Sequence, residues 1–234
     1  IYLFQYLQKI LPKSKKSIRD ISNFSFLKLN SKEEKELEKF LNRFESKNNS
    51  IIHDLFYYYQ MSELMCSGCN EIKVSFQANN VLFLSLYDSI TPLISLEQCI
   101  NSYLFTKDKK GDKEFTCSSC GKPNLSHVIS IIKLPPILVI NLKRVGEKGI
   151  YDHDINIPFK FKTKNFEKLE KFNMEYELIG FIKHYGSAED GHNVAFTKNI
   201  FDQKWYLFND SKVESINGIP KTDKAFLLFY QIIH

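Results

Sequence analysis

The sequence predicts an α+β fold, and three observations lead to this prediction. Residues 1–60 carry helical patterns, short β-rich runs follow from about residue 61, and most of these runs are joined by links of hairpin length. Helices first and strands later are typical of α+β proteins, and short links between strands favour a mostly antiparallel sheet. With 234 residues, the chain is long enough for one large domain or two small ones.

The helical patterns lie at three places in the N-terminal region. The stretch from Ile1 to Leu11 is apolar with few breaks. Ser31 followed by Glu34 is a capping-box pattern, and we expect it to open a second helix. A further helix or turn is expected over residues 51–59.

The predicted strands are short apolar or β-branched runs bounded by turn-forming residues. They cover residues 71–76, 81–87, 128–133, 137–143, 176–184, 192–199, 204–208 and 225–232. Residues 160–171 are rich in Lys and Phe, and we expect a charged surface connection there.

Charge and composition exclude several classes of protein. The formal net charge is +5, from 32 basic and 27 acidic residues, but only Arg19, Arg43 and Arg144 are Arg. Arg is the usual residue for bidentate recognition of phosphates and bases, so we expect no nucleic-acid partner. No apolar run approaches the roughly 18 residues of a membrane helix, so we expect no membrane partner either.

The start of the sequence predicts where the protein is found. The chain begins with Ile1 rather than Met, and it shows no signal-peptide pattern. We therefore expect a piece of a longer polypeptide, located in the cytoplasm or nucleus, where thiols stay reduced.

Four of the five cysteines form two C-x-x-C pairs, Cys66 with Cys69 and Cys117 with Cys120. Each pair is a tight knuckle, and two knuckles supply the four thiolates of a closed tetrahedral zinc site. Because 47 residues separate the pairs, such a metal would pin the base of an inserted lobe. The alternative is two redox-active or incidental pairs.

Two details bear on the cysteines. Gly68 and Gly121 lie at places where knuckle turns need backbone freedom, which favours the metal site. Cys99 lies in a stretch whose apolar residues follow helical spacing, so we expect it to be a buried small hydrophobe on a helix.

Histidines mark the candidate catalytic region. A predicted strand ends at His184, a polar loop follows, and His192 opens the next strand. Asn209 ends the strand after that, 17 residues further on. In a tight hairpin these positions are neighbours, so Asn209 or Asp210 is expected to hold one nitrogen of His192 and leave the other free. The alternative is a surface histidine beside a plain turn.

An ordered set of motifs resembles the ubiquitin-specific proteases, a family of papain-like cysteine deubiquitinases with thumb, palm and fingers. The stretches that resemble it are Asp54-Leu-Phe56, the two knuckles, Ser95–Ile100, Ile132–Arg144, Tyr176–His192 and Trp205–Val213. The resemblance covers roughly residues 50–234. It implies a partial helical thumb over residues 1–60, zinc-ribbon β fingers over 61–125 and an antiparallel β palm over 126–234, all in one domain.

The resemblance also implies roles for individual residues. His192 would be the catalytic base, Asn209 the orienting residue and Asp210 a nearby polar helper. Cys66, Cys69, Cys117 and Cys120 would bind structural Zn²⁺. The loop from His184 to Gly191 would border the channel for the ubiquitin tail.

The implied reaction is hydrolysis of the isopeptide bond after the C-terminal glycine of ubiquitin, through an acyl-enzyme thioester. The implied partners are ubiquitin and ubiquitinated proteins, and the chain is expected to be a monomer.

The sequence departs from the family at the nucleophile. The family's Asn-x-x-Cys-Tyr-type box is not found, and Tyr2–Gln8 resembles the helix that follows it, which puts Ile1 at the nucleophile position. Where the family usually has an aromatic after the catalytic His, this chain has Asn193.

Three hypotheses remain open. The first is a deubiquitinase whose nucleophile lies outside this chain, and the second is an inactive homologue that binds ubiquitin or scaffolds a complex. The third is a zinc-ribbon nucleic-acid binder, which three Arg residues disfavour.

Overall fold

A computed structural model describes residues 27–88, 91–104, 107–110, 116–122, 124–146, 149–166, 168–187 and 190–233. The chain divides into two compact units, each built from two separate segments. Unit 1 comprises residues 1–80 and 104–135, and unit 2 comprises residues 81–103 and 136–234. The helix expected over Ile1 to Leu11 lies outside the described residues.

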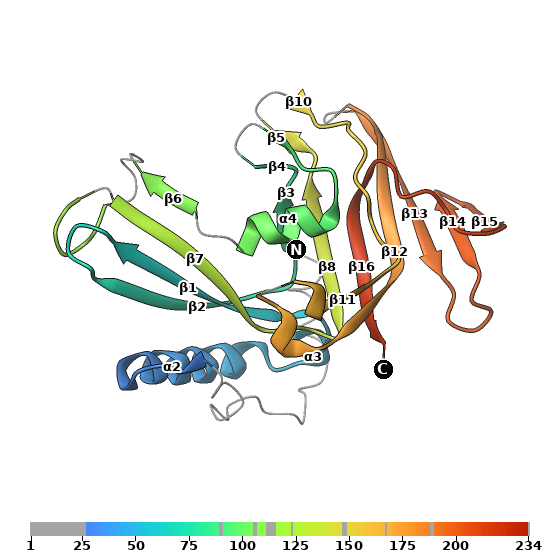
Figure 1. The fold of residues 1–234 in the computed structure, drawn as a ribbon. Helices are drawn as coiled ribbons and strands as arrows, with labels where there is room; N and C mark the ends of the chain where they lie inside the picture. Colours follow the sequence, from blue (N-terminus) through green and yellow to red (C-terminus); the bar gives the residue numbers. More distant parts are fainter. Residues whose placement is uncertain are drawn as a thin grey trace. The chain divides into compact units, whose positions relative to one another are not determined.

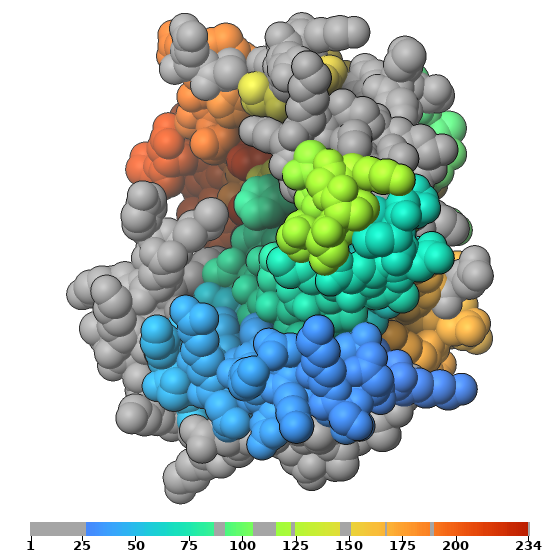
Figure 2. All heavy atoms as spheres, turned by 90° about the vertical axis from the view of Figure 1, so that its left-hand side faces the viewer, coloured from blue at the N-terminus to red at the C-terminus, as the bar shows by residue number. Residues whose placement is uncertain are grey.

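Unit 1 is a four-stranded antiparallel sheet with helices (Figure 1). Its sheet has the strand order β2-β1-β7-β6. Its elements are α2 (Ser31–Asn48), α3 (Ile51–Phe56), β1 (Tyr58–Cys66), β2 (Ile72–Asn79), β6 (Lys107–Lys110) and β7 (Asn124–Lys133). Figure 2 shows α2, in blue, lying along the sheet strands in teal.

The core of unit 1 forms where α2 and α3 cover the sheet. Leu37 and Leu41, one helical turn apart on α2, are buried together with Ile52 of α3 and with apolar side chains of the sheet such as Tyr59. This spacing puts one apolar stripe of α2 on the sheet, which is how an amphipathic helix is stabilised.

Unit 2 is built around an eight-stranded sheet (Figure 1). The strand order is β15-β14-β13-β12-β16-β8-β3, and β11 pairs with β12. The sheet strands are β3 (Leu82–Ser85), β8 (Ile137–Lys143), β11 (Lys160–Lys162), β12 (Glu175–Gly186), β13 (Gly191–Lys198), β14 (Trp205–Asn209), β15 (Lys212–Ile216) and β16 (Ala225–Ile233). All pairings are antiparallel except β3 with β8, which is parallel.

Smaller elements complete unit 2. They are β4 (Tyr87–Asp88), β5 (Thr91–Pro92), α4 (Leu96–Leu104, whose last residue is assigned to unit 1), β9 (Val145–Gly146), β10 (Gly149–Ile150) and two 3₁₀ turns, η2 (Thr163–Asn165) and η3 (Glu170–Phe172). None of the helices in the described part of the chain is long and apolar enough to cross a membrane.

The structure corrects the start of α2. Its N-cap is Asn30 rather than Ser31, because the Asn30 side chain accepts hydrogen bonds from the backbone of Lys32 and Glu33. Glu33 completes the capping box by accepting the Asn30 N–H at 2.9 Å. The motif can be read in two adjacent registers, and Asn is at least as good an N-cap as Ser.

Two strands of five or more residues were not predicted. Strand β1 begins at Tyr58, inside the segment expected as helix or turn, because the aromatics after Phe56 pack well on a pleated central strand. Strand β15 was missed because it is an exposed edge strand with alternating charges rather than an apolar run.

The segment 160–171 is less exposed than we expected. Phe161, Phe166 and Leu169 are buried, while its lysines other than the half-buried Lys168 are exposed. The ring of Phe161 lies 4.9 Å from that of Tyr230 and 5.4 Å from that of Tyr176. The segment therefore anchors itself in the core of unit 2 through its aromatic residues.

Candidate functional site

His192 and Asn209 meet at one end of the sheet in unit 2. Nε2 of His192 lies 2.6 Å from Oδ1 of Asn209. The ladder between β13 and β14 ends with Ala195 opposite Phe208, and continuing it by one residue would place Asn209 opposite Val194. His192 is on the same strand face as Val194, so the two side chains are diagonal neighbours within hydrogen-bonding reach.

This hydrogen bond determines which nitrogen of the His192 imidazole carries a hydrogen. An amide oxygen only accepts, so Nε2 of His192 carries the hydrogen and donates it to Asn209. In the neutral ring, Nδ1 is then an acceptor that can take a proton. The His192 side chain is 47% exposed, so a reactant can approach it.

Asp210 does not share this contact. Its Oδ2 lies 4.0 Å from Nε2 of His192, and its side chain is 81% exposed. Asp210 occupies the two-residue turn between β14 and β15 with φ of 51°, in the left-handed region that Asp and Asn tolerate better than most residues. The turn itself therefore explains the residue type, and the charge acts on His192 only at a distance.

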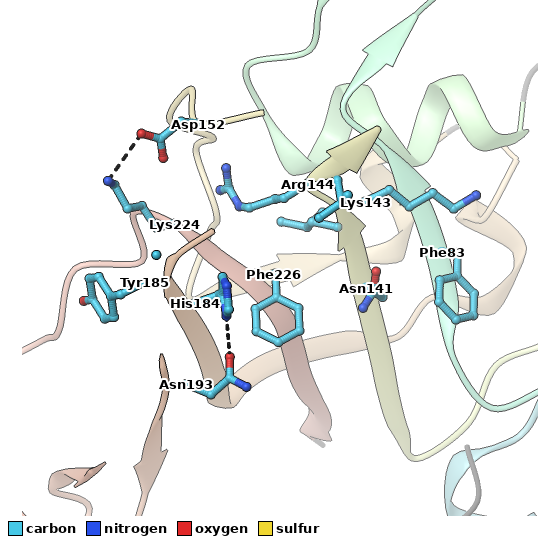
Figure 3. Close-up of a pocket in the computed structure, with 13 residues that line it drawn as sticks. Phe83, Asn141, Lys143, Arg144, Asp152, His184, Tyr185, Asn193, Lys224 and Phe226 are labelled. Atoms are coloured by element: carbon cyan, nitrogen blue, oxygen red, sulfur yellow. Dashed lines mark hydrogen bonds and ion pairs between the residues drawn. The ribbon is translucent and has the colours of Figure 1, made fainter. Parts of the chain in front are cut away.

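A cavity of about 640 Å³ lies beside the start of β13 in unit 2 (Figure 3). His184, Tyr185 and Gly186 from the end of β12 line it, together with Asn193. Its other polar lining residues are Asn141, Lys143, Arg144, Asp152 and Lys224. The Lys224 ammonium and the Asp152 carboxylate form an ion pair at 3.3 Å.

Arg144 holds backbone segments of unit 2 together. Its Nε donates to the carbonyl of Ala225 at 2.8 Å, and its Nη1 donates to those of Tyr151 at 3.0 Å and His153 at 3.1 Å. The residue is only 8% exposed. Its burial lowers the pKa of the guanidinium, while the carboxylates of Asp152 and Asp154 favour the charged form.

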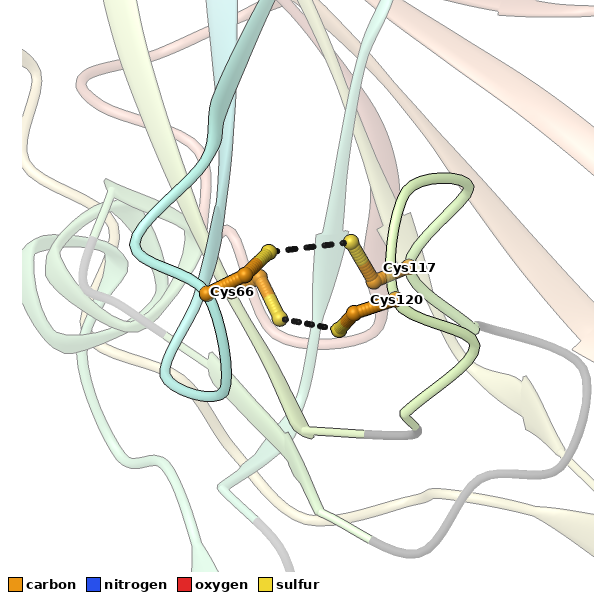
Figure 4. A group of neighbouring side chains, drawn as sticks. Cys66, Cys117 and Cys120 are labelled. Carbon is orange, nitrogen blue, oxygen red and sulfur yellow. Dashed lines mark hydrogen bonds between the residues drawn. The ribbon is translucent and has the colours of Figure 1, made fainter.

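The four knuckle cysteines converge in unit 1 (Figure 4). Their sulfur atoms all lie within 4.8 Å of one another, with 3.6 Å between Cys66 and Cys120 and 3.6 Å between Cys69 and Cys117. A tetrahedral ion with metal–sulfur bonds of about 2.3 Å needs sulfurs about 3.8 Å apart. The residues therefore fit a single metal ion.

The two knuckles have matching backbone geometry. Asn70 and Gly121, each directly after the second cysteine of its pair, donate their N–H to the carbonyl of the first cysteine at 2.8 Å. Both are left-handed, with φ of 58° and 71°. The expectation for Gly121 is met, whereas Gly68 does not have a positive φ; its N–H lies 3.3 Å from the Cys66 sulfur.

Cys99 is a core residue, as predicted. It lies on α4 with no exposed surface. Burial raises the pKa of its thiol to about 11, so at neutral pH it is not a thiolate. Cys69 and Cys120 are exposed, but both belong to the four-sulfur cluster of unit 1, and the one cysteine outside that cluster, Cys99, is buried.

The family follows from a comparison with known proteins. The family model described as ubiquitin carboxyl-terminal hydrolase matches residues 2–230 of this chain.

The chain belongs to the ubiquitin carboxyl-terminal hydrolase family.

Curated members of the hydrolase family resemble the chain over most of its length. Ubiquitin carboxyl-terminal hydrolase 8 of Saccharomyces cerevisiae is 32% identical over 200 residues, which cover 78% of this chain and 41% of the relative. Ubiquitin carboxyl-terminal hydrolase 2 of Gallus gallus is 29% identical over 199 residues, covering 81% of this chain and 55% of the relative. The chain thus spans about half the length of these hydrolases.

Solved structures give the same family assignment. The Ubp8-Sgf11-Sgf73-Sus1 SAGA DUB module matches with a TM-score of 0.64 and 28% identity, over 100% of this chain and 51% of the matched chain. The SAGA Ubp8/Sgf11/Sus1/Sgf73 DUB module bound to ubiquitin aldehyde matches with a TM-score of 0.62 and 27% identity, over 86% and 49%. These matches confirm the predicted α+β, papain-like fold of the ubiquitin-specific hydrolases.

The sequence did not assign individual roles to Arg144 and Asn193 of this chain. Both line the cavity, and Arg144 also ties three carbonyls together. One signal was present for Arg144: it is the only Arg among residues 126–234, where the other basic residues are mostly Lys, and this suggests a fixed contact with several donors. Asn193 was noted only as a departure from the family after His192, because its contact with His184 depends on strand register.

Proposed function

We propose that this chain is the thumb, finger and palm part of a thiol-dependent deubiquitinase. The observation that carries the proposal is the hydrogen bond of 2.6 Å between His192 and Asn209, since it leaves Nδ1 of His192 free to act as a base. The substrate is the peptide or isopeptide bond after the C-terminal glycine of ubiquitin. The family of the chain supports this reaction.

In this proposal, Nδ1 of His192 takes the proton of a thiol that lies outside the 234 residues. The thiolate attacks the glycine carbonyl, and the leaving amine receives the proton from His192, which gives a thioester. His192 then deprotonates a water, and the resulting attack releases the ubiquitin carboxylate and regenerates the thiol. Asn209 keeps the ring oriented throughout, and Asp210 contributes a distant negative charge.

The metal in this proposal is a structural Zn²⁺. The four sulfurs supply the soft, closed tetrahedral set that zinc takes in structural sites. When bound, the ion would stabilise the β1–β7 end of unit 1, and it takes no part in hydrolysis.

We propose that the chain divides into three parts. The thumb comprises residues 1–60, the fingers, which carry the metal site, residues 61–125, and the palm residues 126–234.

Ubiquitin and ubiquitinated proteins are the proposed partners. A related DUB module has been solved bound to ubiquitin aldehyde, which supports ubiquitin as the ligand.

We further propose that the chain is monomeric by itself and acts in the cytoplasm or nucleus, where metal-bound thiolates persist. Light scattering of the purified chain and imaging of the tagged natural protein test these two points.

The second candidate function is a ubiquitin-binding homologue without activity. It is favoured by one observation: the only one of the five cysteines outside the four-sulfur cluster, Cys99, is buried and has a raised thiol pKa. It predicts binding of ubiquitin without cleavage.

The experiment compares the natural polypeptide that contains these residues with its point variants. Ubiquitin carrying a C-terminal fluorophore is the substrate. We expect His192→Ala to lower kcat by at least about 100-fold and Asn209→Ala by about 10- to 100-fold. Asn217→Ala, an exposed amide on the loop after β15, is the matched control and should keep full activity.

Activity that survives His192→Ala would contradict the deubiquitinase proposal. Absence of hydrolysis, combined with ubiquitin binding in a calorimetric titration, would establish the second candidate instead. A lack of both would reject both functions.

A further inference from the structure

His184 stands where two strands and a loop of unit 2 come together. It lies near the end of β12 and pairs directly with Asn193 on β13. The next pair in the ladder is Tyr185 with His192. Any shift in this end of the hairpin would therefore move the backbone of His192.

Polar contacts hold both nitrogens of the His184 ring. Nδ1 lies 2.9 Å from Oδ1 of Asn193 (Figure 3). Nε2 lies 2.7 Å from the carbonyl oxygen of Ser187. The first contact ties the end of β12 to β13, and the second ties it to the loop that follows it. One side chain thus connects three backbone segments.

The faces of the ring are also constrained. A Cβ atom added to Gly191 would collide with Cε1 and Nε2 of His184, so the imidazole fills the space above that glycine. The ring of Phe226 lies 6.4 Å away at an interplanar angle of 88°. Gly191 directly precedes His192, so the His184 ring packs against the residue that leads into the candidate base.

The described part of the loop is closed by its own hydrogen bonds. The Ser187 N–H donates to the carbonyl of Asp190 at 3.0 Å, and the Asp190 N–H donates to Oγ of Ser187 at 2.9 Å. Gly186 has φ of 103°, which suits only glycine. Because Ser187 is bonded to both His184 and Asp190, the His184 contact is linked to both described ends of the turn.

Both contacts of the His184 ring persist in either charge state. A carbonyl only accepts, so Nε2 carries a hydrogen in both states. Nδ1 donates to Oδ1 of Asn193 when the ring is charged, and it accepts from the Asn193 amide nitrogen, after a half-turn of that amide, when the ring is neutral. The Ser187 carbonyl and then Asn193 raise the pKa of His184.

We propose that His184 is a positioning residue that fixes the β12–β13 hairpin end and thereby holds His192 against Asn209. This inference rests on the proposed function only for its effect on hydrolysis. Its structural part concerns the imidazole of His192 and is measured without any reaction.

The test uses the 234-residue chain with ¹⁵N-labelled histidine and hydrogen exchange. In the wild type, ring nitrogen shifts should report the Nε2–H form of His192. For His184→Ala we expect mixed tautomers at His192 and about tenfold faster exchange of the amides of residues 191–193. His184→Gln restores a donor toward Ser187 and should recover at least half of the lost exchange protection.

The matched control is His127→Ala, which removes an imidazole from unit 1. His127 contacts Ser62 there, so this variant reports a general loss of stability. It should leave the His192 tautomer unchanged. An unchanged tautomer and unchanged exchange in His184→Ala, or an equal change in His127→Ala, would overturn the proposal.

A parallel measurement in the natural polypeptide separates this inference from the proposed function. His184→Ala should lower kcat by about tenfold with little change in KM, because orientation of the base is lost rather than substrate binding. If the natural polypeptide does not hydrolyse ubiquitin conjugates at all, the proposed function fails, while the tautomer and exchange results still decide the role of His184.

Discussion

The imidazole of His53 lies in the core of unit 1, with only 2% of its surface exposed. Its Nε2 is 2.6 Å from the hydroxyl of Tyr59, and Nδ1 is 3.6 Å from Oδ1 of Asp54. Burial, followed by the nearby Lys133 ammonium, lowers the pKa of His53 to about 4, although Asp54 acts in the opposite direction. The folded protein therefore holds this ring neutral, while the unfolded chain protonates it near pH 6.5.

This difference predicts a loss of stability in weak acid. Above about pH 6.5 the His53 ring is neutral in the folded and in the unfolded state, so its titration does not lower the free energy of unfolding. Between about pH 6.5 and 4 only the unfolded state binds the proton, so the free energy of unfolding should fall by up to about 3 kcal/mol. Urea unfolding at pH 7 and pH 4.5 should show a steeper decline for the wild type than for His53→Gln. Equal declines in the two proteins would contradict this account.

The contact between His192 and Asn209 was predictable because their relation is local. His192 and Asn209 lie on adjacent strands joined by one short hairpin, so a count of residues suffices to bring them together. The contact of His184 with Ser187 and Asn193 was not predictable, because it depends on side-chain rotamers and on the space above Gly191. The burial of His53 depends on packing between α2, α3 and the sheet, which no short pattern reports.

At the scale of the element, the start of α2 tests which residue caps a helix. Asn30→Ala removes the acceptor for two backbone N–H groups, so it should lower the free energy of unfolding by about 1 kcal/mol. Ser31→Ala is the matched control, and its effect should stay within about 0.5 kcal/mol. Urea unfolding of both variants checks this. A larger loss in Ser31→Ala than in Asn30→Ala would show that Ser31 is the N-cap.

The knuckles predict how unit 1 responds to loss of metal. Without the ion, four converging thiolates repel each other, and the ends of β1 and β7 lose their anchor. A strong chelator should release one Zn²⁺ per chain and speed hydrogen exchange at the Cys66 end of β1 and the Leu125 end of β7. Strands β12–β16 of unit 2 are the internal reference.

Two results would contradict the metal site. One is unchanged exchange in unit 1 after the chelator has removed all bound metal. The other is a Cys117→Ser variant that still binds one zinc ion per chain with wild-type affinity.

Most elements were predictable where the sequence pattern is periodic. Strands β8, β12, β13, β14 and β16 lie within two residues of their predicted bounds, because each is an apolar run between turn residues. The pattern fails where tertiary contacts override it. The run after α3 becomes a central strand, and the Lys-rich segment after β10 buries its aromatic residues.

At the scale of the whole molecule, the sequence predicts the fold class but not the tracing of the chain. Strand β3 pairs in parallel with β8, although more than 50 residues separate them and most strand pairs are hairpins. Local periodicity contains no information on such a pairing, because it depends on which segments meet after long connections. The division into two units, each made of two segments, likewise could not be predicted from the amino-acid composition.

This interleaving has a consequence for a protein that is cut. Cleavage between Asn80 and Val81 divides the polypeptide at a unit boundary, yet β1 stays paired with β7, which lies beyond the cut. We expect the nicked halves, after insertion of a protease site at this position, to co-elute in native gel filtration and to separate only in denaturant. Separation in native buffer would show that the ladder between β1 and β7 cannot hold the fragments together. The two fragments should thus remain associated after a single break in the backbone at this position.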